Sequence, residues 1–174
     1  MLIHNAGINA VGRFYEVSIE EQEREVAVNL EAPMVLTAEL LKAEHVCDGG
    51  SLVFMSSLSH YVSYPGASVY AATKSGLASY ARSLSVALVA QDIHVMTVFP
   101  GPTRTAHARR YSPDNSREEK RMAPEALAER IFGGVNKRKR FLIPGFGNRM
   151  IAIIGKWFPG VMEDMMRRVI LERL

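Results

Sequence analysis

The sequence of 174 residues lacks several features that would define other classes of protein. Its single cysteine, Cys47, excludes an intramolecular disulfide, which suits a reducing compartment. Its five histidines are scattered and show no metal-ligand spacing, so we expect no metal site. No apolar run reaches the roughly 18 residues of a transmembrane helix. The N-terminal residues lack the regions of a signal peptide, so the expected location is the cytoplasm.

Acidic and basic residues are unevenly distributed along the chain. Residues 1–103 contain 5 Lys/Arg and 10 Asp/Glu, whereas residues 104–174 contain 16 and 8, so charges of −5 and +8 give the net charge of +3. The basic part lacks interleaved aromatic residues that could stack on bases, so we do not expect nucleic-acid binding. The excess of basic residues fits a membrane surface, an acidic substrate or a solvated face.

Predicted strands alternate with predicted helices along most of the chain. Apolar and β-branched runs predict strands over residues 1–3, 52–55, 93–99 and 141–143. Helical patterns cover residues 18–42, 69–90 and 124–135, and two amphipathic helices follow, divided at Pro159 and Gly160. Residues 104–123 are polar, and we expect a loop there. This order predicts an α/β fold with a parallel sheet covered on both sides.

Tyr70 and Lys74 lie four residues apart on the predicted helix 69–90, and therefore on one face of it. A phenol has a pKa near 10, and an ammonium group within about 4–6 Å favours its ionised form. The pair can therefore act as a general acid/base. Taken alone, this spacing is also typical of a solvated helix face.

Two further segments place polar groups at strand ends, where the active sites of parallel α/β sheets lie, and a third places an asparagine within a helix. Ser57 follows the predicted strand 52–55, and its hydroxyl can donate to a substrate carbonyl oxygen. Asn29 interrupts an apolar helix face, so we expect its polar atoms to be satisfied by the structure or by water. Residues 100–105, with sequence PGPTRT, follow the predicted strand 93–99.

Together these motifs resemble the short-chain dehydrogenase/reductase family in order and in spacing. They are HNAG at residues 4–7, Asn29, Ser57, YAATK at residues 70–74 and PGPTRT at residues 100–105. Position 4 departs from the family pattern, which usually has Asn; we interpret His4 as a tolerated substitution at a strand end. The resemblance is close over residues 1–105 and looser beyond. It implies a Rossmann-type, doubly wound parallel sheet.

The resemblance also implies a role for each motif residue. Tyr70 would exchange a proton with the substrate oxygen, Lys74 would lower the Tyr70 pKa and bind the nicotinamide ribose, and Ser57 would hold the substrate oxygen. Asn29 would keep a water in the proton relay through its main-chain carbonyl. The implied cofactor is NAD(H) or NADP(H), and the implied substrate is a small ketone or secondary alcohol. The residues implied to contact the cofactor are Asn5, Ala6, Gly7, Tyr70, Lys74, Pro100, Gly101, Thr103 and Thr105.

Family members begin with a strand and the glycine-rich motif TGxxxGxG, which cradles the pyrophosphate at a helix N-terminus. This chain has no such run, so roughly 80 residues would be missing if three βα units normally come first. We therefore interpret it as a family fragment whose strand at residues 1–3 would be a sheet edge. Two alternatives remain: a non-catalytic remnant or interaction module, and a misplaced gene start.

The last 29 residues extend beyond the predicted strand 141–143. We divide the chain into a catalytic part, residues 1–145, and an amphipathic helical extension, residues 146–174. This tail resembles that of family members that reduce lipid ketones near membranes, which implies a lipid-like substrate and weak contact with a membrane surface. Packing of the same helices on the domain or on another subunit is the alternative. The family resemblance implies a homo-oligomer assembled through helices 18–42 and 69–90.

Overall fold

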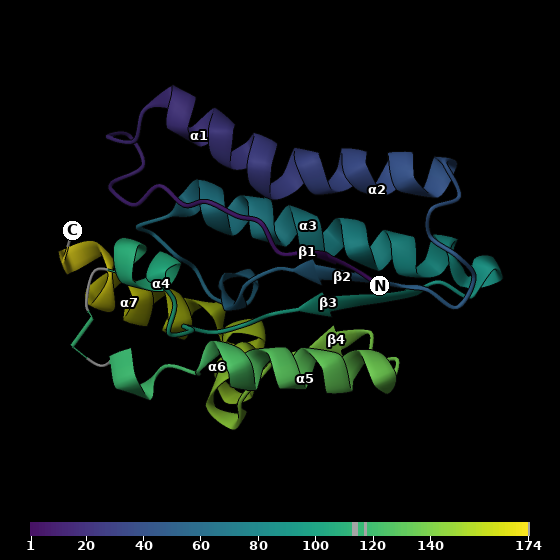
Figure 1. Ribbon diagram of the computed structural model, residues 1–174. Helices are drawn as coiled ribbons and strands as arrows, with labels where there is room; N and C mark the ends of the chain where they lie inside the picture. Colours follow the sequence, from purple (N-terminus) through teal and green to yellow (C-terminus); the bar gives the residue numbers. More distant parts are fainter. Residues whose placement is uncertain (113–114, 117, 174) are drawn as a thin grey trace.

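A four-stranded parallel sheet forms the centre of the computed structural model, which describes residues 1–112, 115–116 and 118–173. Every neighbouring pair of strands is parallel, in the order β1 (Leu2–His4), β2 (Ser51–Met55), β3 (His94–Val98) and β4 (Phe141–Leu142). On one side of the sheet lie α1 (Ile19–Val26), α2 (Ala32–Lys42) and α3 (Ser68–Ala87), and on the other lies α5 (Pro124–Asn136) (Figure 1). The predicted α/β fold is confirmed, and β1 is an edge strand of this sheet.

Alternate residues of the central strand β2 point into two different cores. Leu52 and Phe54 pack with α3 residues such as Leu77, and Val53 and Met55 pack with Ile131 of α5. A strand buried on both faces must be apolar throughout, which explains the continuous apolar run in the sequence. Because helices cover both faces, only the ends of the strands are left for polar chemistry.

The predicted helix over residues 18–42 contains a π-helical segment, Ala27–Glu31, between α1 and α2. Ser18 caps its start, with the Ser18 Oγ accepting a hydrogen bond from the Glu21 amide at 3.2 Å. In the π segment, the Ala32 amide donates to the carbonyl of Ala27, five residues earlier. Such turns are rare and are frequently found at functional sites, and this one contains Asn29.

The prediction of a loop over residues 104–123 is wrong in part. Helix α4 (Ala106–Tyr111) and a 3₁₀ turn at Glu118–Lys120 lie within it. Thr105 is the N-cap of α4, since its Oγ1 accepts a hydrogen bond from the Ala108 amide at 3.1 Å. Thr105 is a local capping signal that could have predicted α4, but the residues around it are polar and the helix is short.

Helices α6 (Phe146–Trp157) and α7 (Pro159–Val169) follow, with a 3₁₀ turn at Leu171–Arg173 after them, and the predicted division at Pro159 is confirmed. Gly155 of α6 lies against the main chain of Tyr61, because a Cβ at position 155 would collide with the Tyr61 carbonyl oxygen. Helix α6 is therefore packed directly on the segment that follows Ser57. None of the helices described in residues 1–112, 115–116 and 118–173 is long and apolar enough to cross a membrane.

Candidate active site

The segments that follow β2 and β3 are bonded to each other at the carboxyl end of the sheet. The Ser56 amide donates to the Val98 carbonyl and the Leu58 amide to the Pro100 carbonyl, both at 2.9 Å. The Ser56 hydroxyl also donates to the Lys74 carbonyl of α3 at 2.8 Å. These bonds bring the loop carrying Ser57, the segment beginning at Pro100 and helix α3 to one place.

Ser57 and Tyr70 meet there, with their side chains joined by a hydrogen bond. Burial raises the pKa of the Tyr70 phenol, the bond with Ser57 opposes this rise, and the nearby Tyr64 and Glu25 add to it. The Ser57 Oγ also accepts a bond from the Ser59 amide at 3.2 Å, which caps the 3₁₀ turn Leu58–His60. The two hydroxyl groups are thus held together by the folded chain itself.

The Lys74 side chain is buried next to them. Its Nζ donates to the Met55 carbonyl at 2.9 Å and lies 5.7 Å from the centre of the Tyr70 ring. Burial lowers the pKa of Lys74 to about 8. Burial outweighs the bond with Ser57, so the pKa of the Tyr70 phenol is raised in this structure, and the lowering of that pKa by Lys74 stays a prediction. The predicted placement of both residues on one face of a helix is confirmed.

Asn29 connects the helical layer to the chain that follows β1. Its Oδ1 accepts from the Ile8 amide at 2.8 Å, and its Nδ2 donates to the Ile8 carbonyl at 2.9 Å and to the Thr73 hydroxyl at 3.3 Å. The side chain is fully buried, and its polar atoms are satisfied as expected. A Cβ on Gly7 would lie 3.2 Å from the Lys74 Nζ and 3.3 Å from the Asn29 Oδ1, so glycine allows this close approach. Residues 5–7 therefore run beside Lys74, with Asn5 and Ala6 exposed.

The Pro100 segment is fixed by its own hydroxyl groups and by α6. The Thr103 Oγ1 donates to the Gly101 carbonyl at 3.1 Å. A Cβ on Gly101 would collide with the side chain of Asn148, whose Nδ2 donates to the Pro144 carbonyl at 2.7 Å. Asn148 is therefore part of this wall, and no sequence motif could have predicted it, because its contact depends on how α6 packs.

A second residue not singled out in the sequence is His107 of α4. Burial lowers the pKa of its imidazole, and the positive charges of Lys74 and Arg110 lower it further. His107 is therefore within electrostatic reach of Lys74. The Thr105 cap that starts α4 is the signal that could have placed it there.

His4 stands where the family usually has asparagine. It is the last residue of β1, and its side chain is buried. Its Nε2 shares a hydrogen bond of 2.8 Å with the Thr37 hydroxyl, and its ring stacks on Phe54 with centroids 4.8 Å apart. Burial lowers its pKa. His4 thus joins β1 to α2, which is a structural role.

The depressed pKa of Lys74 predicts a dependence of stability on pH. Between the folded-state value of about 8 and the ordinary value of 10.5, the unfolded chain binds more protons than the folded chain. Stability from this group therefore rises as the pH increases through that window. The melting temperature of the wild type, measured relative to that of Lys74→Met, should therefore rise between pH 7.5 and pH 10.5. Parallel curves would contradict this, and Lys42→Met, which removes an exposed lysine, is the control.

Comparison with known proteins agrees with this arrangement. The family model for short-chain dehydrogenases matches residues 1–116, more than half of the chain, and the chain belongs to this family. The human dehydrogenase/reductase SDR family member 4 is 28% identical over 120 residues, which cover 68% of this chain and 43% of the relative. The chain thus spans about half the length of the curated relatives it matches.

Two solved structures share the fold. A short-chain dehydrogenase from Sphingobium yanoikuyae in complex with NADPH is 27% identical, with a TM-score of 0.73, over 92% of this chain and 64% of that one. The landomycin C-6 ketoreductase LanV, with bound NADP and rabelomycin, is also 27% identical, with a TM-score of 0.69, over 82% of this chain and 58% of that one. The predicted family and Rossmann-type α/β class are confirmed.

Proposed function

We propose that residues 1–174 supply the catalytic part of an NAD(P)(H)-dependent oxidoreductase that interconverts a ketone and a secondary alcohol. The observation that carries the proposal is the convergence of Ser57, Tyr70 and Lys74 at the carboxyl end of β2. A hydroxyl pair next to a buried ammonium group is suited to moving a proton to or from a substrate oxygen. The NADPH complex of one structural relative and the ketoreductase name of another are consistent with this chemistry.

The groups present fit a nicotinamide nucleotide. Lys74 has three N–H donors, and its described hydrogen bond to Met55 uses one of them, which leaves donors for ribose hydroxyl groups. Gly7 lets the chain run close to Lys74, and the main chain at Thr103 lies on the same edge of the sheet. These residues, with Asn5, Ala6, Pro100, Gly101 and Thr105, would hold NAD(H) or NADP(H). When bound, the reduced nicotinamide supplies a hydride to the carbonyl carbon.

In reduction, the Ser57 hydroxyl donates to the substrate oxygen and the Tyr70 Oη gives it a proton, so that a secondary alcohol forms. The positive charge of Lys74 stabilises the phenolate that Tyr70 becomes. Oxidation of the alcohol runs through the same groups in reverse, with Tyr70 as the base. Asn29 keeps residues 7 and 8 in place next to Lys74.

The proposal is tested on a fusion in which residues 1–174 follow the glycine-rich, cofactor-binding half of a family member. We call this fusion the joined protein. We expect oxidation of NADH or NADPH that depends on an added ketone, with the secondary alcohol identified by mass spectrometry. A protein that binds the cofactor but turns over no ketone from a broad panel would support the alternative of an interaction module.

A homo-oligomer is proposed on the outer faces of α2 and α3, which expose apolar side chains. Val35 is 54% exposed and Val86 is 67% exposed. The small residue Gly76 is already used within the chain, because a Cβ there would lie 3.2 Å from Leu30. Light scattering of the joined protein should therefore give a dimer or tetramer, and Val35→Ser with Val86→Ser should shift it toward the monomer. A monomer at micromolar concentration in the unaltered protein would contradict this contact.

A lipid-like substrate and weak binding to an anionic membrane are proposed for residues 146–174. Phe146 is 78%, Trp157 69% and Phe158 62% exposed, and α6 has two basic residues, Arg149 and Lys156, and no acidic one. Apolar side chains beside basic ones suit a helix that lies in a membrane interface. The other exposed apolar residues of α6 and α7 are Met150, Ile153, Ile154, Val161, Met165 and Val169.

Co-sedimentation with vesicles of phosphatidylserine and phosphatidylcholine should show binding that weakens as salt is added. The double variant Phe146→Ser, Trp157→Ser should lose most of it. The matched control, Val89→Ser with Phe132→Ser, removes exposed apolar side chains from another part of the surface and should bind as the wild type does. If the wild type did not bind the vesicles, the alternative that these helices pack on the domain or on another subunit would be favoured.

A further inference from the structure

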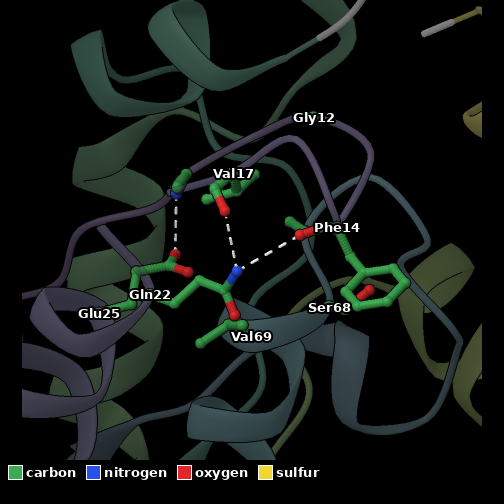
Figure 2. Close-up of a pocket in the computed structure, with 9 residues that line it drawn as sticks. Gly12, Phe14, Val17, Gln22, Glu25, Ser68 and Val69 are labelled. Atoms are coloured by element: carbon green, nitrogen blue, oxygen red, sulfur yellow. Dashed lines mark hydrogen bonds between the residues drawn. The ribbon is translucent and has the colours of Figure 1, made fainter. Parts of the chain in front are cut away.

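Three polar side chains on one face of the helix from residue 19 to residue 31 bind the main chain of residues 8–17. We call Gln22, Glu25 and Asn29 the polar ladder. The Gln22 Nε2 donates to the carbonyls of Phe14 at 3.3 Å and Val17 at 3.0 Å, and the Glu25 Oε1 accepts from the Ala10 amide at 2.9 Å (Figure 2). Asn29 binds Ile8, as described above. The ladder therefore fixes the course of the chain from the Gly7 motif outward.

Glu25 is the unexpected member of the ladder. Its side chain is 1% exposed, and no cation pairs with it among the residues that the structure describes. Burial raises its pKa, the bond from Ala10 opposes this, and Glu21 adds to the rise. An apolar side chain would fill such a site without the desolvation cost of a carboxyl group. The carboxyl group therefore points to a function beyond packing.

The segment that Glu25 holds faces the loop that leads into Tyr70. The Gly12 amide donates to the Gly66 carbonyl at 3.0 Å, which closes one end of the contact. Phe14 and Ser68 line the small pocket next to Glu25 (Figure 2). Both also line an open cleft of about 480 Å³. The remaining residues that line this cleft are Arg13, Tyr15, Pro65 and Leu171. Most of its lining is apolar.

We propose that Glu25 is a positioning residue of the active site, holding residues 10–17 against the loop before Tyr70 and thereby shaping the wall that meets an apolar substrate. The inference rests on the proposed function, because the position of residues 10–17 matters for turnover only if Tyr70 acts on a substrate. Glu25 acts through the Ala10 hydrogen bond and through its negative charge.

The charge is relevant because Glu25 and Tyr70 interact electrostatically. Four groups face Tyr70: Lys74 of its own helix, Tyr64 and Ser57 of the preceding loops, and Glu25 of α1. Glu21 faces Glu25. His107 of α4 faces Lys74. A negative charge at Glu25 raises the pKa of Tyr70. Removing that charge while keeping the shape should therefore lower the pKa of the phenol.

The first test needs no enzyme activity and uses the 174-residue chain. Amide hydrogen exchange at Ala10 should be close to wild type in Glu25→Gln, which keeps an acceptor oxygen, and about tenfold faster or more in Glu25→Leu, which has none. If Glu25→Leu does not fold, Glu25→Asp, whose shorter side chain withdraws the acceptor, replaces it. Unchanged exchange at Ala10 in the variant without the acceptor would overturn the proposal.

The second test uses the protein joined to a cofactor-binding half. Glu25→Leu or Glu25→Asp should raise KM for a bulky apolar ketone about tenfold and change kcat little. Glu25→Gln should keep KM and move the pH profile of kcat/KM toward lower pH, a shift that a purely structural role would not cause. The exposed neighbour Glu23, changed to Gln, is the control. An unchanged KM in the first pair, or a stationary profile in Glu25→Gln, would overturn the role. If the joined protein showed no turnover, the proposed function would be wrong. The amide exchange at Ala10 would still test whether Glu25 holds residues 10–17.

Discussion

Replacing Tyr70 with phenylalanine is expected to reduce ketone turnover by at least about 100-fold, because general acid–base catalysis typically contributes 10²–10⁴-fold. The substitution removes the hydroxyl that bonds to Ser57 and leaves the ring and its packing. Cofactor binding should change little, since Lys74 and its bond to Met55 remain. The measurement is steady-state kinetics on the joined protein, with a separate titration of NADPH.

The same substitution elsewhere on α3 provides the control. Tyr80 also lies on α3, and its hydroxyl donates to the Met34 carbonyl at 3.3 Å, far along the helix from Ser57. Tyr80→Phe should keep nearly the whole wild-type rate. A Tyr70→Phe protein that retained more than about a tenth of that rate would show that another group donates the proton.

The 174-residue chain by itself is expected to bind NADPH or NADH at least about 100-fold more weakly than a full-length relative, and to show negligible turnover. A glycine-rich pyrophosphate cradle supplies several hydrogen bonds to charged oxygens, each worth about 1.5–3 kcal/mol, and this chain contains no such run. Calorimetric titration against a full-length relative such as the human SDR family member 4 provides the comparison. A micromolar dissociation constant for the 174-residue chain would contradict the expectation.

Most secondary-structure elements could be predicted because their signals are local. Two-sided apolar runs predicted β2 and β3, and the helical pattern over residues 18–42 predicted α1 and α2. The candidate site residues Ser57, Tyr70 and Lys74 could be predicted from motif and spacing, and the structure brings them together. Helix α4 was missed because a six-residue helix gives too little periodicity to stand out from its polar surroundings.

What could not be predicted depends on contacts between distant segments. Glu25 lies in a helix rich in glutamate, where a single carboxyl group is indistinguishable from its solvated neighbours. It becomes buried because residues 8–17 fold back over α1 and the start of α3 packs beside it. Asn148 reaches Gly101 across 47 positions of sequence, and that contact depends on the packing of α6. Neither contact can be predicted from the residue pattern of one segment alone.

The π segment at Ala27–Glu31 sets the rotational phase of the helix on its two sides. In a regular α-helix each residue turns the chain by about 100°, so one residue accommodated in a wider turn separates the phase of α2 from that of α1. Glu25 of α1 faces residues 8–17, while Thr37 of α2 faces His4. If residues 27–31 took up a regular α-helix at the same length, one of these faces would rotate away from its partner. A relative one residue shorter here could present both faces without the wide turn, so aligning the two sequences requires a one-residue gap inside a helix.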